Sequence, residues 1–309
     1  MKHKIAAIDI GTNSFHLIIA YLDDKNKIQV VESSRKVIRL NSVNLAKNII
    51  PQEVIDNTIL ILNDFVKTAK LYNSEIKAVA TSAVREAENK SEFVNQVYKS
   101  TGIKIEVIDG ETEAGLIYKG VQKAIIIGDK TTLCIDIGGG STEFIIGKEG
   151  KVLFAKSVKL GAVRLSKMFF PNYFIDDNKV NTCEKFVTNE LLITIEEISK
   201  FKIDLVVGSS GTINSAAQMI NAKNNKVVNK TELNGYGFSK NELENIKMEI
   251  LNVKSLENRK QIKGLEEKRA DVIPAGMILL YSIFQMLDIK NLIVSSYALR
   301  EGIVVDSSN

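Results

Sequence analysis

Two matching segments of the chain each carry an aspartate, a glycine-containing turn and a serine. They read IDIGTNSFHLIIA from Ile8 to Ala20 and IDIGGGSTEFIIG from Ile135 to Gly147. In such turns successive backbone N–H groups converge on one anion, because glycine has no Cβ to block its approach. A sharp hairpin with no ligand is the alternative for either turn taken alone. The predicted phosphate-binding residues of the two turns are Gly11, Thr12, Asn13, Ser14, Gly138, Gly139, Gly140, Ser141 and Thr142.

A third glycine-containing turn follows an apolar run in the sequence VVGSSGTINSAA. A helix is expected to begin directly after it, and the unpaired N–H groups at a helix N-terminus bind anions. An ordinary helix cap is the alternative, because serine and threonine are favoured there. The predicted phosphate-binding residues of this turn are Gly208, Ser209, Gly211 and Thr212.

The two aspartate-containing segments form an internal repeat, because they align in one register. In each copy an apolar run ends at the aspartate, the turn reverses the chain and a second apolar run follows, which is typical of a β-hairpin. Two such hairpins in a chain of 309 residues predict two similar domains, 1–125 and 126–296.

Strands alternate with helices around the hairpins, which is typical of an α/β fold. The pattern predicts a helix after Pro51, a strand running into a loop at 76–86, a helix ended by Gly102, a strand at 103–110 and a helix at 111–125. In the second half it predicts strands at 151–161 and 203–211 and helices at 180–201 and 212–220.

The composition is that of a globular protein, with 45% hydrophobic and 25% charged residues. A net charge of +4 favours anionic partners only where it is clustered, so nucleic acid is not predicted as a partner. The apolar segment 272–287 contains Pro274 and is shorter than a membrane-spanning helix, and Asp9 interrupts the N-terminal apolar run. Neither a membrane span nor a signal peptide is therefore predicted.

Cys134 and Cys183 lack disulfide-framework or zinc-type spacing, which favours a reducing, cytoplasmic setting.

Taken together, the motifs resemble those of the exopolyphosphatase and guanosine pentaphosphate phosphohydrolase (Ppx/GppA) family, within the actin-like superfamily. The resemblance covers almost the whole chain, and its most specific part is DIGGGSTE with the ETEA segment before it. It implies two actin-like (ribonuclease H-like) α/β domains with mixed sheets flanked by helices, a cleft between them, and a last helix, 297–309, that returns to the first domain. The chain looks like the short, two-domain form. The matching motifs are IDIGTNSFHLIIA, AVATSAVREAEN, IDGETEAGLIYKGV, IDIGGGSTEFIIG, VKLGAVRLSKMFF, VVGSSGTI, RADVIPAGMILL and IVSSYALREGIV.

The resemblance implies hydrolysis of a terminal phosphoanhydride bond, with magnesium or manganese as cofactor. Glu113 aligns with the family glutamate thought to orient and deprotonate the attacking water, and Glu111 is the second choice. Glu143 resembles a second family glutamate and is implied as a catalytic residue and, with Asp9 and Asp136, as a metal ligand. The alternatives are an acid that complements a helix dipole for Glu113 and an exposed strand residue for Glu143.

Three arginines also occur in family motifs. Arg85 matches an arginine thought to contact phosphate, and its planar fork suits an anion, so it is predicted as catalytic. Arg269 is predicted to bind phosphate, and Arg164 is a weaker candidate for the same role. Between Lys254 and Arg269 six basic and three acidic residues either extend a positive surface for a long polyanion or form a solvated helix.

The substrates implied are inorganic polyphosphate, guanosine pentaphosphate (pppGpp) or both. An actin-like ATPase or sugar kinase, and a sensor that binds guanosine phosphates without turnover, are the competing interpretations, and self-association as a homodimer is left open. His3 and His16 are the only histidines, and neither is a candidate general base. Many relatives have a Val-His-Gly motif where this chain has Leu-Asn-Gly, so the effect of Asn234 on substrate choice is also open.

Overall fold

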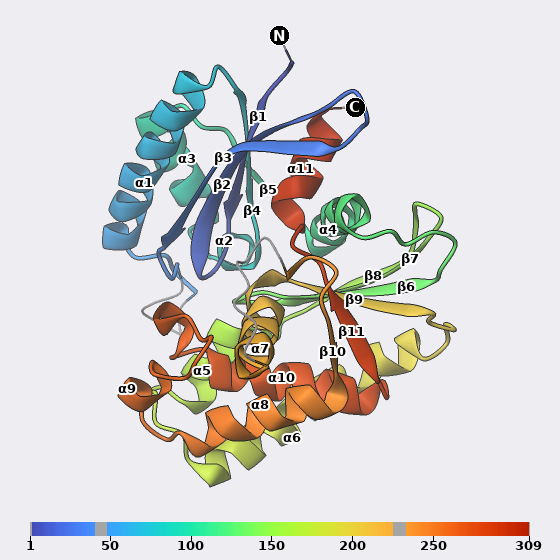
Figure 1. Cartoon of the computed structure of the whole chain (residues 1–309). Coiled ribbons are helices and arrows are strands. Elements are labelled where there is room, and N and C mark those ends of the chain that lie inside the picture. Colours follow the sequence, from blue (N-terminus) through green and yellow to red (C-terminus); the bar gives the residue numbers. More distant parts are fainter. Residues whose placement is uncertain (1, 41–47, 225–232, 309) are drawn as a thin grey trace. The chain divides into compact units, whose positions relative to one another are not determined.

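The computed structural model describes residues 2–40, 48–224 and 233–308. The chain divides into two compact units: unit 1 comprises Met1–Lys123 and Tyr297–Asn309, and unit 2 comprises Ala124–Ser296. Each unit is built on one mixed β-sheet flanked by helices (Figure 1), which confirms the predicted α/β class.

Unit 1 contains a five-stranded sheet in the order β3-β2-β1-β4-β5. Strand β1 pairs antiparallel with β2 and parallel with β4, so the first predicted hairpin is confirmed. The elements are β1 (Ile5–Ile10), β2 (Ser14–Leu22), β3 (Ile28–Val37), α1 (Gln52–Leu71), β4 (Glu75–Ala80), α2 (Ser82–Arg85), α3 (Lys90–Thr101), β5 (Ile105–Val107), α4 (Gly110–Ala124) and α11 (Leu299–Ser307).

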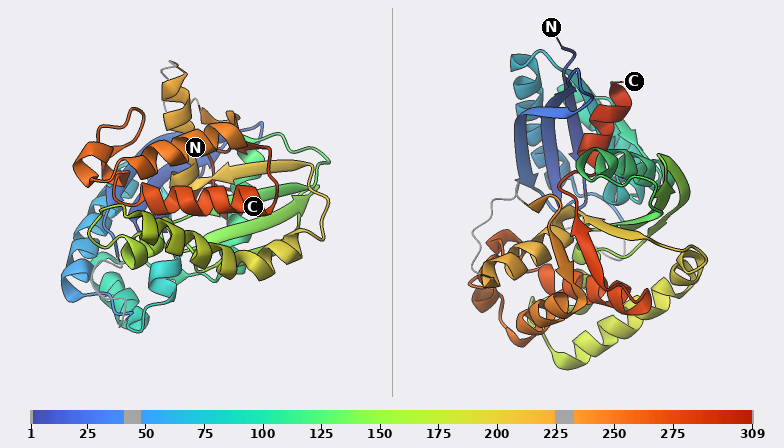
Figure 2. Two further views of the ribbon diagram at one scale, coloured as in Figure 1. Left: turned by 90° about the horizontal axis from the view of Figure 1, so that it is seen from below. Right: turned by 45° about the vertical axis from the view of Figure 1, so that its right-hand side comes forward.

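Helices cover both faces of the unit 1 sheet. Helices α1 and α3 lie together on one face, and α11 packs on β1 and β2 at the other (Figures 1 and 2). Ile8 and Ile10 are buried in the core on the α1 and α3 side. Since side chains alternate along a strand, Asp9 points to the opposite face, the one that α11 covers.

Unit 2 contains a six-stranded sheet in the order β10-β11-β9-β6-β7-β8. Read from β8, its first five strands repeat the order and directions of unit 1, which is the actin-like arrangement expected, and β6 and β7 form the second predicted hairpin. The elements are β6 (Thr132–Ile137), β7 (Thr142–Lys148), β8 (Lys151–Val158), α5 (Ala162–Phe169), α6 (Asp177–Ile198), β9 (Leu205–Ser209), α7 (Ser210–Lys223), β10 (Gly237–Ser239), α8 (Lys240–Asn252), α9 (Leu256–Arg259), η2 (Glu267–Arg269), α10 (Ile273–Met286) and β11 (Asn291–Val294).

The apolar segment that contains Pro274 is the central helix of unit 2. Helix α10 is buried along nearly its whole length, begins with Pro274 in its first turn and packs beside α6 and α8 (Figure 2). Among the residues that the structure describes, no helix is both long and apolar enough to cross a membrane. Cys134 and Cys183 are buried free thiols, and burial raises the pKa of Cys183 to about 12.

Local signals predicted several element ends. Gly102 ends α3 in the left-handed conformation, with φ of 75°, as the sequence predicted. The loop expected after β4 is instead the short helix α2, in which the Arg85 N–H donates to the Thr81 carbonyl at 2.9 Å. This extra turn fixes the direction in which Arg85 leaves the backbone.

The basic segment between Lys254 and Arg269 is not one solvated helix, so that interpretation is wrong. It contains the short helices α9 and η2, and Arg259 is fully buried. The Arg259 guanidinium donates to four backbone carbonyls, those of Tyr173, Val253, Lys254 and Ala270. One of the six basic side chains is therefore structural, since its hydrogen bonds join three chain segments.

Candidate functional site

The first glycine turn joins β1 to β2 in unit 1. A Cβ on Gly11 would lie 3.1 Å from the Ser14 carbonyl oxygen, so the turn is too tight for a larger residue without local adjustment. The Thr12 and Asn13 carbonyls accept hydrogen bonds of 3.0 to 3.1 Å from the backbone of residues 38–40. Because the C=O and N–H of one planar trans peptide point in opposite directions, the Asn13 and Ser14 N–H groups point away from that segment.

A row of polar side chains crosses the unit 1 sheet beside this turn. Asp9, His16 and Arg35 are cross-strand partners on β1, β2 and β3, so they share one face. His16 Nε2 lies 2.8 Å from Ser14 Oγ. Burial, followed by the charge of Arg300, lowers the pKa of Arg35. Sequence reasoning did not connect Arg35 with Arg300, because the two residues lie in distant segments, and Arg300 itself pairs with Glu301 at 3.4 Å.

Glu113 and Arg85 form an ion pair in unit 1. Glu113 lies in the first turn of α4 and is 6% exposed, whereas Glu111 is exposed. Arg85 Nη1 lies 2.8 Å from Glu113 Oε2 and donates to the Ile108 carbonyl at 3.0 Å. The two hydrogen bonds of Arg85 fix the guanidinium, and the guanidinium in turn fixes the orientation of the Glu113 carboxylate. The structure thus brings two predicted catalytic residues together.

Asp109 supports this arrangement, although it was not among the predicted site residues. Its Oδ1 accepts the Thr112 N–H at 2.8 Å and its carbonyl accepts the Glu113 N–H at 3.0 Å, so it caps α4. The Thr112 hydrogen bond is the largest cause of the lowered pKa of Asp109. An aspartate three residues before Thr112, at a helix start, was the available sequence signal.

We expect the Asp109→Ala variant to lower the Tm by about 2 °C at pH 7, because α4 loses its cap. The Asp109→Asn variant keeps an acceptor oxygen and should lose less. Since the folded-state pKa is lowered, this contribution is present above the ordinary value of 3.8 and is lost as pH falls through the lower folded value. Thermal melts from pH 7 to pH 3 measure it, and an Ala variant as stable as the parent at pH 7 would contradict the cap.

The second glycine turn, in unit 2, packs against the start of α5. The Gly138 and Gly139 carbonyls accept hydrogen bonds of 2.9 to 3.0 Å from backbone N–H groups in the first turn of that helix. The Gly140 carbonyl accepts from Arg164 Nε at 2.8 Å. The three carbonyls of the turn are therefore directed toward α5, and Arg164 takes a supporting role there.

The opposite side of the same three peptides presents N–H groups. By the geometry of a trans peptide, the Gly139, Gly140 and Ser141 N–H groups point away from α5, and successive N–H groups of this kind bind anions. Gly138 contributes differently, because its N–H closes the turn on the Ser141 carbonyl at 3.0 Å. Thr142 also has a supporting contact, since its buried hydroxyl donates to the Leu160 carbonyl at 2.7 Å.

A polar row crosses the unit 2 sheet at the position equivalent to that in unit 1. Asp136, Glu143 and Ser157 are cross-strand partners on β6, β7 and β8. Ser157 Oγ donates to Glu143 Oε1 at 2.7 Å, and Ser209 Oγ donates to Asp136 Oδ2 at 2.6 Å. Glu143 is 1% exposed, so the alternative of an exposed strand residue is wrong. Two neighbouring buried carboxylates repel each other, and a cation would offset that repulsion.

The third turn joins β9 to α7 and lies against Arg269. A Cβ on Gly211 would overlap the Arg269 guanidinium, so any residue other than glycine at position 211 would displace that side chain. Ser210 has φ of 72°, a left-handed conformation that is uncommon outside glycine and often found at functional turns. Thr212 is buried in the first turn of α7. The turn combines a helix N-terminus with an arginine, and both favour an anion.

Gly208 has a packing role in the same region. A Cβ there would lie within 3.0 Å of the Leu292 and Ile213 side chains. The Gly208 carbonyl accepts the Ser295 N–H at 2.8 Å. Gly208 therefore allows the end of β9, just before the turn, to pack closely against these side chains.

Comparison with known proteins assigns the chain to a family. The model of the Ppx/GppA phosphatase family matches residues 18–309. The chain belongs to the Ppx/GppA phosphatase family. The family predicted from the sequence motifs is therefore confirmed.

Individual Ppx/GppA relatives share most of this chain. A protein of Haemophilus influenzae named as a candidate exopolyphosphatase is 32% identical over 97% of this chain and 90% of its own length. A guanosine-5'-triphosphate,3'-diphosphate pyrophosphatase of Photobacterium profundum is 28% identical over 97% of this chain, which spans only 58% of that relative. The crystal structure of an exopolyphosphatase from Cytophaga hutchinsonii superposes with a TM-score of 0.91 at 27% identity, covering 99% of each chain.

The carboxylates Asp136 and Glu143 of this Ppx/GppA chain offer the oxygen ligands that hard cations prefer. Within the described part of the chain, no three or more His, Cys, Asp or Glu side chains gather into a metal-binding group. Asp136 and Glu143 are adjacent, whereas Asp9 belongs to unit 1. Magnesium binds through one or two carboxylates and several waters, so the oxygen donors of unit 2 fit it.

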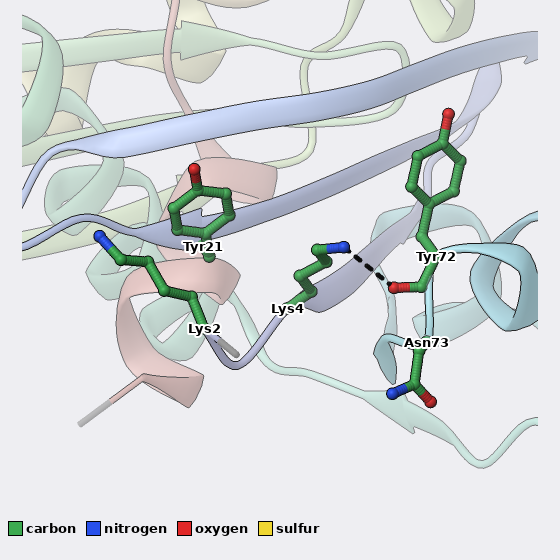
Figure 3. Close-up of a pocket in the computed structure, with 5 residues that line it drawn as sticks. All are labelled: Lys2, Lys4, Tyr21, Tyr72 and Asn73. Carbon is green, nitrogen blue, oxygen red and sulfur yellow. Dashed lines mark hydrogen bonds between the residues drawn. The ribbon is translucent and has the colours of Figure 1, made fainter.

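A shallow pocket of about 250 Å³ in unit 1 contains none of the predicted site residues. It is lined by Lys2, Lys4, Tyr21, Tyr72 and Asn73 (Figure 3). Lys4 Nζ donates to the Tyr72 carbonyl at 3.4 Å, and Lys2 Nζ lies 5.6 Å from the centre of the Tyr21 ring. The pocket lies at the N-terminal end of β1, the end opposite the Gly11 turn, so it is separate from the predicted site residues of unit 1.

Proposed function

We propose that this chain hydrolyses terminal phosphoanhydride bonds, releasing orthophosphate from inorganic polyphosphate, from pppGpp, or from both. The observation that carries the proposal is the buried Glu113 carboxylate, oriented by Arg85 at 2.8 Å in the first turn of α4. The names of the relatives support both substrate classes.

In this mechanism Glu113 holds the attacking water in line with the terminal phosphorus and accepts a proton from that water. Arg85 holds the carboxylate in place between turnovers. The oxygen of the water forms the new P–O bond, and the remaining phosphate chain leaves with the bridging oxygen.

Backbone N–H groups and arginine neutralise the phosphoryl oxygens. The Gly139, Gly140 and Ser141 N–H groups, and Arg269 beside the start of α7, are the donors that unit 2 provides. Asp136 and Glu143 would hold magnesium or manganese, which supplies further charge neutralisation when bound. Asp9, which belongs to unit 1, remains the third predicted metal ligand.

The substrate is tested by comparing kcat/KM for long polyphosphate, short polyphosphate and pppGpp at one magnesium concentration. We expect orthophosphate release without ATP from at least one of them. Phosphate release that requires ATP would favour the actin-like ATPase or kinase interpretation. Tight binding of pppGpp with no turnover would favour a sensor, although two buried carboxylates beside a polyanion are unfavourable for binding alone.

A further inference from the structure

The Asn234 side chain connects the two ends of unit 2. The unit begins at Ala124 and ends at Ser296, the residues at which the chain passes to and from unit 1. Asn234 Nδ2 donates to the Ala124 carbonyl at 2.9 Å. Asn234 Oδ1 accepts from the Ser296 N–H at 3.1 Å and lies 3.2 Å from Ser296 Oγ. Since a carbonyl only accepts and an N–H only donates, these partners fix the orientation of the amide.

The turn that carries Asn234 is itself held on the sheet. The Gly235 N–H donates to the Val294 carbonyl and the Val294 N–H donates to the Tyr236 carbonyl, both at 2.8 Å. Gly235 has φ of 79°, a conformation that glycine adopts without strain. Asn234 is therefore presented from a fixed backbone, although its side chain is exposed.

Each hydrogen bond reaches a segment that leads to proposed site residues. Ala124 is the last residue of α4, and Glu113 lies in the first turn of that helix, about 16 Å away along its axis. Ser296 follows Ser295, whose N–H donates to the Gly208 carbonyl at the start of the third turn. One side chain thus contacts the end of the helix that carries the proposed base and the segment bonded to a phosphate-binding turn.

We propose that Asn234 is a positioning residue that fixes the end of α4 and the segment 295–296 to one turn of unit 2. Its kinetic effect rests on the proposed hydrolysis, because the position of Glu113 matters only if Glu113 acts on water. Its local effect, protection of the Ser296 amide, does not depend on the reaction.

The test compares Asn234→Ala and Asn234→Asp with Asn189→Ala, an exposed asparagine on α6. Amide hydrogen exchange at Ser296 is measured together with kcat and KM for phosphate release from polyphosphate and pppGpp. We expect Asn234→Ala to speed Ser296 exchange about fivefold and to lower kcat about tenfold with little change in KM. Asn234→Asp keeps the acceptor for Ser296 but loses the donor to Ala124, so exchange should stay slow while kcat falls. Asn189→Ala should leave both unchanged.

Hydrogen exchange at Ser296 and the kinetics of phosphate release together distinguish a failure of the positioning role from a failure of the proposed hydrolysis. Unchanged Ser296 exchange in Asn234→Ala would overturn the connection itself. Faster Ser296 exchange in Asn234→Ala, together with a parental kcat in both Asn234 variants, would overturn the positioning role. If the parent chain hydrolyses neither substrate, the proposed function fails and the positioning role fails with it, while the exchange rate still decides whether Asn234 holds the two ends.

Discussion

We expect the Glu113→Gln variant to release orthophosphate with a kcat lowered by about 10²- to 10⁴-fold, the contribution typical of a general base. Glutamine has nearly the same shape, and its carbonyl oxygen can still accept the Arg85 hydrogen bond seen at 2.8 Å. The variant loses only the capacity to take a proton from water. Single-turnover phosphate release, together with equilibrium binding of pppGpp, measures the two effects separately.

Glu111→Gln is the matched control for this variant. Glu111 lies two residues earlier in the same helical turn but is exposed. Its replacement changes the charge of the turn equally and should leave kcat within about twofold, since an exposed charge contributes little to the site. Equal losses in the two variants would show that the charge of the helix start, rather than the carboxylate of Glu113, supports the reaction.

The second large effect is the loss of activity when divalent cations are removed. With EDTA in excess we expect turnover to vanish, and magnesium or manganese should restore it, because Asp136 and Glu143 are buried side by side and suit a hard cation. The Asp136→Asn variant should need about tenfold more magnesium for half-maximal rate. Rates measured across a magnesium titration give this shift.

Asp129→Asn is the control for the metal experiment, since Asp129 is an exposed aspartate of the same unit. Its magnesium dependence should match that of the parent. Full turnover in excess chelator would remove Asp9, Asp136 and Glu143 from the proposed metal set.

The sequence predicted the parts of the fold that depend on local order. The repeated Asp-Ile-Gly segments indicated both hairpins, and the strand register of the structure shows that Glu143 lies opposite Asp136 as His16 lies opposite Asp9. Alternation of strands and helices then gave the α/β class. These features follow from neighbouring residues, so one sequence contains enough information to predict them.

Contacts between distant segments could not be predicted in this way. The Arg85–Glu113 pair joins α2 to α4, and the Arg269 guanidinium occupies the space beside Gly211. Motif matching selected these residues one at a time, and only tertiary packing shows that they meet. The same holds for Ser157, whose hydroxyl donates to Glu143.

Two interpretations were wrong because burial was not visible in the sequence. Glu143 was compared with an exposed strand residue, yet both faces of the unit 2 sheet are covered where β7 lies. The run from Lys254 to Arg269 has the composition of a solvated helix, but Arg259 lies inside and satisfies backbone carbonyls. Charge composition alone does not show which charged side chain is buried.

The most direct test of the account is the source of the oxygen in the released orthophosphate. A single turnover with polyphosphate or pppGpp in ¹⁸O-labelled water should give orthophosphate with one labelled oxygen. In Glu113→Gln the same product should form about 10²- to 10⁴-fold more slowly. Released phosphate without the label, or labelled product formed by Glu113→Gln at the parental rate, would contradict water attack directed by Glu113.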